Sequence, residues 1–196
     1  MKIISLFSRS GHMLEPWARS GHEVLSIDSH EATHTMPHIQ GDILKIPPME
    51  CDVLFAFPPC QHLSAAGAGH WKKKGPVPLA EALVLWSVAH LWTHRSALWL
   101  VENPRGRVVH YWPKWNFKFQ PFEFAQYHPE DPQIDAYTKQ TFIWSNFEKP
   151  ALWPVVPVQG MKKHKCAKYK GDRAYRRAIT PRGFAHAVFH HLQGAK

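Results

Sequence analysis

The stretch Asp52-Val-Leu-Phe-Ala-Phe-Pro-Pro-Cys-Gln-His-Leu-Ser64 decides the fold that we predict for this chain. An apolar run from Val53 to Phe57, bounded by an acidic residue and two prolines, is typical of a buried strand. Because proline cannot donate to a sheet ladder, this strand must end at Pro58. Cys60 therefore lies on a stiff loop at a strand's carboxyl end, the edge where open α/β sheets bind ligands. Considered alone, the stretch fits an inert cysteine in a turn equally well.

The N-terminal residues predict two further strands of the same sheet. The first runs from Lys2 to Phe7 and the second from Glu23 to Ile27. Between them we expect a Ser/Gly turn and a helix from about His12 to Ser20, stopped by Gly21. Asp28 follows the second strand, where an acidic side chain can accept hydrogen bonds from ribose hydroxyls of a nucleotide cofactor. Many α/β proteins contain such a turn and bind no cofactor.

A second strand end downstream resembles the one at Cys60. The run Ala97 to Val101 is apolar and is followed by Glu102-Asn103-Pro104. A carboxylate at this sheet edge is placed to meet whatever Cys60 attacks, although Glu102 could instead cap the next helix. Before this strand, residues 78–94 predict an amphipathic helix. Its apolar positions are expected in the core: Leu79, Leu83, Trp86, Val88, Leu91 and Trp92.

The remaining segments give weaker signals. Residues 117–127 alternate weakly and suggest an antiparallel element, Thr141 to Trp144 predicts another strand, and Thr180 is expected to cap a closing helix that ends near Leu192. The turn Gly41-Asp42-Ile43 could meet an adenine amino group or be an ordinary surface turn.

Three histidines lie close together in residues 30–40, which we expect to form a polar loop. They are His30, His34 and His38, and Pro37 interrupts any helix that would align them. Because no Cys or carboxylate cluster completes a metal site, we interpret them as solvated loop residues and predict no metal.

Composition limits the class of protein. At 196 residues we expect one domain. The formal charge of +9 suggests a polyanionic partner, or merely a basic soluble protein. Residues 162–177 carry eight Lys or Arg and one Asp, a net +7, with Tyr169 and Tyr175 interleaved, as suits a nucleic-acid backbone. Three cysteines without framework spacing suggest a reducing compartment. No apolar run is long enough for a signal peptide or membrane span, so we expect a cytoplasmic protein.

Taken together, these stretches resemble the DNA cytosine-5 methyltransferase family, most closely its short phage and prophage members. Pro58-Pro-Cys-Gln61 with Ser64 and Gly67 resembles the nucleophile motif, and Glu102-Asn103-Pro104 resembles the carboxylate motif. The other similarities are weaker singly: residues 6–11 to the first cofactor motif, Gly41-Asp-Ile43 to the adenine motif, residues 139–144 to a motif with a basic residue, and residues 177–184 to the segment after target recognition. Arg9 departs from the usual glycine, Ser5 from an acid and Lys139 from arginine.

The resemblance implies a Rossmann-like, S-adenosylmethionine-dependent methyltransferase fold of the α/β class. It would have a mostly parallel sheet, helices on both faces and a minimal target-recognition segment. Residues 1–196 would form one methyltransferase domain, with the basic segment 155–177 within it. Catalytic roles would fall to Cys60, Glu102 and Lys139. Cofactor contacts would fall to Phe7, Ser8, Ser10, Gly11, Asp28, Asp42, Ile43, Pro58 and Pro59. Nucleic-acid contacts would fall to Gln61, Ser64, Lys162, Lys163, Lys165, Lys168, Lys170, Arg173, Arg176 and Arg177.

The implied activity is methyl transfer from S-adenosylmethionine to carbon-5 of cytosine in DNA. Cys60 would form a covalent adduct with a base flipped out of a duplex. We expect a monomer in the cytoplasm of a bacterial host, or a phage-encoded one. The short recognition region leaves a second interpretation, the same chemistry on RNA, on a free pyrimidine nucleotide or with a modified methyl donor. A third is an inactive DNA-binding protein that kept the fold.

Overall fold

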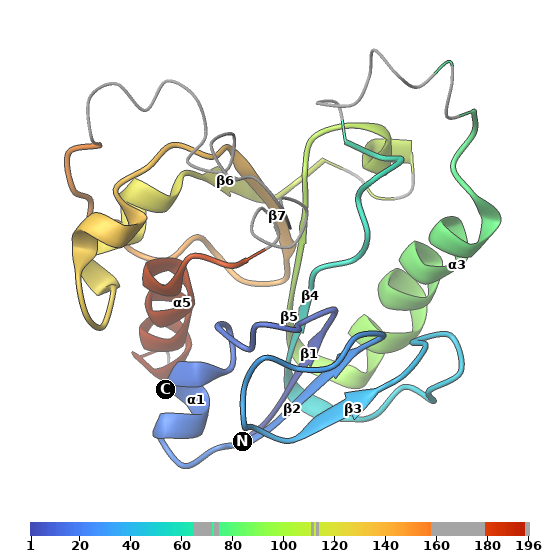
Figure 1. Cartoon of the computed structure of the whole chain (residues 1–196), viewed down its shortest axis with the longest axis horizontal. Helices are drawn as coiled ribbons and strands as arrows, with labels where there is room; N and C mark the ends of the chain where they lie inside the picture. The colour runs from blue at the N-terminus through green and yellow to red at the C-terminus, as the bar shows by residue number, and fades with distance from the viewer. Residues whose placement is uncertain (65–71, 73–74, 111, 113, 158–178, 195–196) are drawn as a thin grey trace.

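The computed structural model describes residues 1–64, 72, 75–110, 112, 114–157 and 179–194. Its centre is a seven-stranded sheet in the order β3-β2-β1-β4-β5-β7-β6 (Figure 1). The strands are β1 (Lys2–Leu6), β2 (Glu23–Asp28), β3 (His38–Gln40), β4 (Cys51–Ala56), β5 (Ser96–Asn103), β6 (Phe117–Phe119) and β7 (Thr141–Ser145). The first five run parallel, and β7 runs antiparallel to both β5 and β6.

Helices cover both faces of the sheet. Helices α1 (Glu15–Arg19) and α5 (Arg182–Gly194) lie together on one face, and α3 (Leu79–Ser87) lies on the other (Figure 1). Helix α3 continues into a π-helical turn η2 (Val88–Trp92) and a 3₁₀ turn η3 (Thr93–Arg95). Further 3₁₀ turns are η4 (Arg107–His110), η5 (Pro121–Tyr127) and η6 (Pro132–Asp135). The strand order 3-2-1-4-5 is that of a doubly wound sheet. This confirms the predicted Rossmann-like α/β class.

Successive residues of the central strands enter two separate cores. In β4, Val53 and Phe55 face α1 and α5, whereas Leu54 and Ala56 face α3. All four are fully buried, as expected for a parallel sheet that is covered on both sides. Because neither face of such a strand meets water, every position is apolar, which explains the continuous apolar runs that predicted these strands.

The apolar stripe predicted for residues 78–94 is only partly right. Val88 and Trp92 are fully buried, but four of the expected core residues are exposed: Leu79, Leu83, Trp86 and Leu91. The buried side of α3 is formed instead by Glu81, Val84 and Leu85. The predicted α-helix also changes to a π turn at Val88, so a spacing of 3.6 residues no longer marks one face.

The closing helix, α5, starts one residue later than a cap at Thr180 predicts. The carbonyl oxygen of Pro181 accepts the first helical bond, from Ala185, and the helix extends to Gly194. The backbone N–H of Gly183 donates to the Asp135 carboxylate at 2.8 Å. A side chain 48 positions away in sequence thus satisfies the helix start, and short-range capping patterns cannot reveal it.

The histidine-rich loop also differs from the prediction. The side chain of His30 is 72% exposed, as predicted, but His34 and His38 are only half exposed, and both hydrogen-bond the Ser26 hydroxyl, at 3.2 and 2.7 Å. His38 belongs to the short strand β3, which pairs with β2. In the described part of the chain, no helix is both long and apolar enough to span a bilayer.

A Gly183→Ala substitution should destabilise the protein by about 1–3 kcal/mol. The added Cβ would lie 2.5 Å from the carbonyl oxygen of Phe124, a backbone atom that cannot rotate away. Gly194→Ala is the matched control, because nothing lies within 4 Å of its Cβ position, and it should change stability by less than about 1 kcal/mol. Urea unfolding followed by circular dichroism measures both. Equal effects of the two substitutions would contradict the packing argument.

Candidate functional site

One edge of the sheet brings together residues from five segments of the chain. The parallel strands β1, β2, β4 and β5 all end there, at Leu6, Asp28, Ala56 and Asn103. Because β7 is antiparallel and pairs its Phe142 with Asn103, it begins at the same edge. Lys139, just before β7, is therefore placed beside Glu102.

Glu102 and Lys139 line a small pocket together with Phe57, at the end of β4, and with the start of α5. The other lining residues are Phe119, Thr141, Thr180, Pro181 and Phe184. Its volume is about 10 Å³, room for about one water molecule. Burial raises the pKa of Glu102, and the nearby Lys139 ammonium partly opposes this rise. A carboxyl group in this environment is suited to donate a proton or a hydrogen bond.

The Cys60 loop is tied to the carboxylate strand by a buried hydrogen bond. The side-chain amide of Asn103 donates to the carbonyl oxygen of Pro58 at 3.2 Å. The carbonyl oxygen of Cys60 in turn accepts from the backbone N–H groups of Leu63 and Ser64, at 3.1 and 3.0 Å. The loop after β4 is thus one hydrogen-bonded turn, and the thiol of Cys60 is partly exposed.

Sequence reasoning missed three residues that hold this turn: His62 within it, and Glu81 and Arg107 outside it. Glu81 of α3 accepts from His62, and the backbone N–H of Arg107 donates to the carbonyl oxygen of Leu63 at 2.8 Å. The Arg107 guanidinium donates to the carbonyl oxygen of Gly75 at 2.9 Å. The sequence offered one sign of this contact, the carboxylate of Glu81 inside the apolar pattern of residues 78–94. That pattern does not reveal that its partner is His62, 19 positions earlier in the chain.

The turn after β1 has two unusual backbone conformations. Phe7 has φ = 57° and Gly11 has φ = 65°, both in the left-handed region, which is costly for phenylalanine. A Cβ on Gly11 would lie 2.4 Å from the His34 ring and 2.5 Å from the Met36 methyl group. The bare backbone of Gly11 therefore accommodates the 30–37 loop, a role the sequence analysis did not assign to it. Ser8 is buried, and Ser10 is half-buried.

Two carboxylates lie next to this turn. Asp28 is largely buried, and its Oδ1 accepts from the backbone N–H of His30 at 2.9 Å and lies 3.1 Å from the His30 ring. The backbone carbonyl of Asp28 accepts from Gly41, which places the Asp42 turn beside it. Asp42 is exposed and accepts from the Leu44 N–H, and Ile43 is buried.

These groups fit a nucleoside-containing cofactor chemically. Asp28 offers carboxylate acceptors to ribose hydroxyls, and the Gly41–Ile43 turn offers polar groups for a purine edge. A ligand that approached Gly11 from its Cβ side would have to displace His34 and Met36. Pro58 is buried and Pro59 exposed at the neighbouring strand end.

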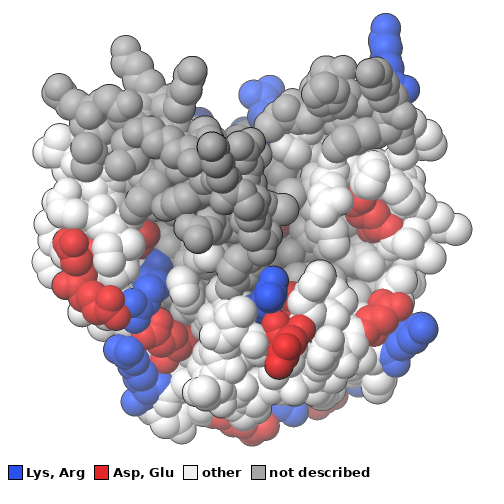
Figure 2. Space-filling model, viewed as in Figure 1, with Lys and Arg blue, Asp and Glu red and all other residues white. Residues whose placement is uncertain are grey.

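The predicted nucleic-acid contacts are mostly outside the described residues. Gln61 is exposed, and Ser64 forms an isolated bridge with Gly106. Lys162 to Arg177 lie outside the described ranges, as does most of segment 155–177. The chain carries +9, and the residues outside those ranges contribute +10, so the described residues carry a formal charge of −1. Accordingly, acidic and basic side chains are interspersed on the face shown in Figure 2.

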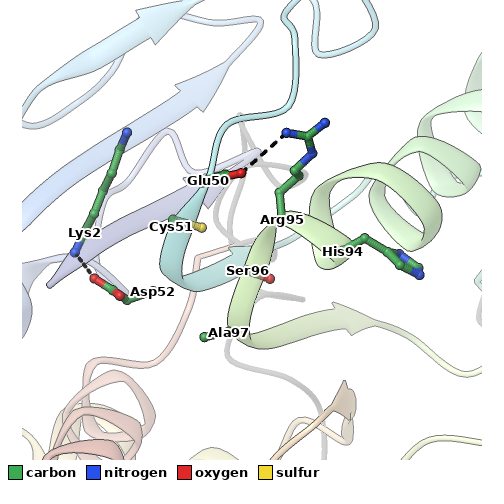
Figure 3. A pocket seen from close by; sticks show the side chains of 8 residues that line it. All are labelled: Lys2, Glu50, Cys51, Asp52, His94, Arg95, Ser96 and Ala97. Atoms are coloured by element: carbon green, nitrogen blue, oxygen red, sulfur yellow. Dashed lines mark hydrogen bonds and ion pairs between the residues drawn. The ribbon is translucent and has the colours of Figure 1, made fainter.

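A larger cavity lies at the opposite edge of the sheet and contains none of the predicted site residues. It has a volume of about 420 Å³ and is lined by Lys2, residues 50–52 and residues 94–97 (Figure 3). Cys51 lies there, and burial raises the pKa of its thiol to about 11. This cysteine is thus protonated and poorly nucleophilic at neutral pH. Within the described ranges, no three His, Cys, Asp or Glu side chains gather as a metal site would require.

Comparisons with known proteins give structural similarities and no sequence match. No model of a protein family matches the chain, and no curated protein does. A crystal structure of a Spodoptera frugiperda DNMT2 triple mutant is similar at a TM-score of 0.43 and 16% identity, over 74% of this chain and 49% of that one. The chain thus spans about half the length of that protein. The strand order and pairing described above establish the fold independently.

Replacing Glu102 by Gln should stabilise the fold increasingly as the pH rises. Burial raises the pKa of Glu102 in the folded state. Its contribution to stability is therefore fully present below the unfolded-state pKa and is lost as the pH rises through the folded-state pKa. Glutamine has no charge to bury and no such loss. Urea unfolding of both proteins between about pH 4 and pH 8 should show diverging stabilities. Parallel curves would mean that Glu102 titrates alike when folded and unfolded.

Proposed function

We propose that this chain is an S-adenosylmethionine-dependent methyltransferase that acts on carbon-5 of cytosine in DNA. The observation that supports it best is that the Cys60 loop and Glu102 lie at neighbouring strand ends of one sheet edge. Cys60 follows β4 and Glu102 is the penultimate residue of the neighbouring parallel strand β5. The buried Asn103–Pro58 bond joins the two strand ends, and burial raises the pKa of Glu102. The turn after β1 and the Asp28 carboxylate lie at the same sheet edge.

Cys60 supplies the nucleophile. Its thiolate forms a bond to carbon-6 of cytosine, and the electrons of the 5,6 double bond shift so that carbon-5 becomes nucleophilic. S-adenosylmethionine, when bound, supplies the methyl group that carbon-5 accepts. A base then removes the proton from carbon-5, and the carbon–sulfur bond breaks to restore the thiolate of Cys60 and the aromatic ring.

Glu102 stabilises the ring while Cys60 adds to it. Addition places negative charge on the N3–C2–O2 part of the pyrimidine, so a neutral carboxyl that donates to N3 favours it. The raised pKa of Glu102 keeps a larger fraction protonated than an exposed glutamate would have. Lys139, beside Glu102 in the pocket, donates to the exocyclic oxygen O2. As a lysine it offers a point charge and lacks the bidentate fork of arginine.

The cofactor is assigned to the neighbouring strand ends. Asp28 accepts from the ribose hydroxyls, and Asp42 and Ile43 contact the adenine. The remaining residues assigned to it are Phe7, Ser8, Ser10, Gly11, Pro58 and Pro59. Each of these residues belongs to the sheet edge that also carries Cys60.

The substrate that we assign is a cytosine flipped out of duplex DNA, at a cost of a few kcal/mol. Gln61 and Ser64, close to Cys60, are assigned to contacts with the DNA around the space that the flipped cytosine leaves in the duplex. The segment Lys162 to Arg177, with its net charge of +7, is assigned to the phosphates, whose contacts offset this cost. A monomer is sufficient for this arrangement.

Cys60→Ala should abolish methyl transfer and covalent trapping on duplex DNA that contains 5-fluorocytosine. Fluorine cannot leave carbon-5 as a proton does, so the adduct persists and is visible as a shifted band on a denaturing gel. Cys51→Ala is the matched control and should trap like wild type, because Cys51 lies at the opposite sheet edge.

The substrate class is tested by offering tritiated S-adenosylmethionine with duplex DNA, RNA and dCTP. Label found only in RNA or dCTP would overturn the DNA assignment, and unchanged transfer by Cys60→Ala would overturn the mechanism.

Asp28→Asn should weaken binding of S-adenosylhomocysteine by about 10- to 100-fold, since a carboxylate acceptor for the ribose is lost. Asp52→Asn, an exposed acid at the opposite end of β4, is the control and should bind like wild type. Isothermal titration calorimetry measures both dissociation constants. Equal affinity of Asp28→Asn and wild type would show that the ribose binds elsewhere.

A further inference from the structure

A buried carboxylate meets the Cys60 turn from the side of α3. Glu81 has 9% of its surface exposed and lies in the first turn of α3. Its Oε2 lies 2.6 Å from Nδ1 of His62, and its Oε1 accepts from the backbone N–H of His62 at 3.4 Å. A carboxylate that is buried this deeply requires such partners. Both oxygens of Glu81 thus contact the residue two positions after Cys60.

The conformation of the turn places His62 and Cys60 on different sides. The carbonyl of Cys60 accepts from the N–H groups of Leu63 and Ser64, as in a single turn of helix. Side chains two positions apart in such a turn do not face one another. The ring of His62 is therefore directed to α3 and not to the thiol. This geometry argues for a role in holding the loop and against proton transfer with Cys60.

Two other contacts of the described residues hold the turn near its ends. Asn103 holds Pro58, before Cys60, and Arg107 holds Leu63 through the backbone, after His62. Glu81 is a residue of α3, which packs on the sheet through Val84 and Leu85. Glu81 and His62 therefore connect the centre of the turn to a rigid element of the core.

We propose that Glu81 and His62 are positioning residues that hold the Cys60 turn in the orientation needed for attack on carbon-6. The effect on the reaction rests on the function proposed above, whereas the effect on the turn itself does not. A misplacement of about 1 Å at a reacting group can lower a rate about 100-fold, and loss of an orienting partner costs about 10- to 100-fold.

Four variants and one control separate this proposal from its alternatives. His62→Ala and Glu81→Ala remove the contact, and Glu81→Gln keeps the shape of the carboxylate without its charge. His62→Asn keeps a donor near the position of Nδ1 but removes Nε2, so it retains the bond without any acid–base group. Glu123→Gln is the control, because Glu123 and Lys149 form a partly buried ion pair elsewhere in the chain, at 2.8 Å.

The first measurement is amide hydrogen exchange at Leu63 and Ser64 in the full chain. We expect exchange to be about tenfold or more faster in His62→Ala and Glu81→Ala. His62→Asn and Glu123→Gln should remain within about threefold of wild type, and Glu81→Gln should lie between these groups. Wild-type exchange in both alanine variants would overturn the anchoring role. This measurement involves no substrate, so it stands even if the chain transfers no methyl group.

The second measurement is the single-turnover rate of covalent trapping on 5-fluorocytosine DNA. His62→Ala and Glu81→Ala should lower it about 10- to 100-fold with an unchanged dissociation constant for S-adenosylhomocysteine, and His62→Asn should recover it to within about threefold. A His62→Asn protein that traps as slowly as His62→Ala, although its amide exchange matches wild type, would overturn positioning in favour of a chemical role for the ring. Absence of trapping in wild type would instead overturn the proposed function.

Discussion

The antiparallel pairing of β5 with β7 is the constraint on which the candidate site depends. A parallel strand beside β5 would begin at the opposite edge of the sheet and place its leading residues far from Glu102. Because β7 runs in reverse, its first residues meet the last residues of β5, with Phe142 opposite Asn103. Lys139 is thereby brought next to a carboxylate 37 positions earlier in the chain, at the edge where β1, β2 and β4 also end.

Two opposing electrostatic effects act on Glu102. Burial disfavours its charged form, and the Lys139 ammonium favours it, with burial the larger of the two. A carboxyl that burial makes less acidic is a poor contributor to stability at neutral pH but a good hydrogen-bond donor. The rise in the pKa of Glu102 is thus a property of the pocket walls, which Phe57, Phe119 and Phe184 help to form.

Contacts between distant segments hold α1 and the start of α5, which flank the candidate site. Arg182 of α5 donates to both Glu15 of α1, at 2.9 Å from Nε, and Glu130, at 2.6 Å. These bonds link the closing helix to α1, the helix that follows the turn after β1. The close approach of Gly183 to Phe124 sets where α5 begins, and residues Thr180 and Pro181 at that start line the Glu102 pocket.

The sequence by itself determined β1, β2, β4, β5 and β7 and the common edge of the parallel ones, since buried parallel strands are continuous apolar runs such as those that stop before Pro58 and Pro104. It did not reveal β3, which lies in a stretch predicted as loop. It also left side-chain partners undetermined. Asp135 caps α5, Ser26 binds two histidines, and Glu81 holds His62, all through contacts between segments whose spacing follows no local period. Only tertiary structure decided these contacts and the face that α3 buries, because burial depends on what packs against a residue and not on its neighbours in sequence.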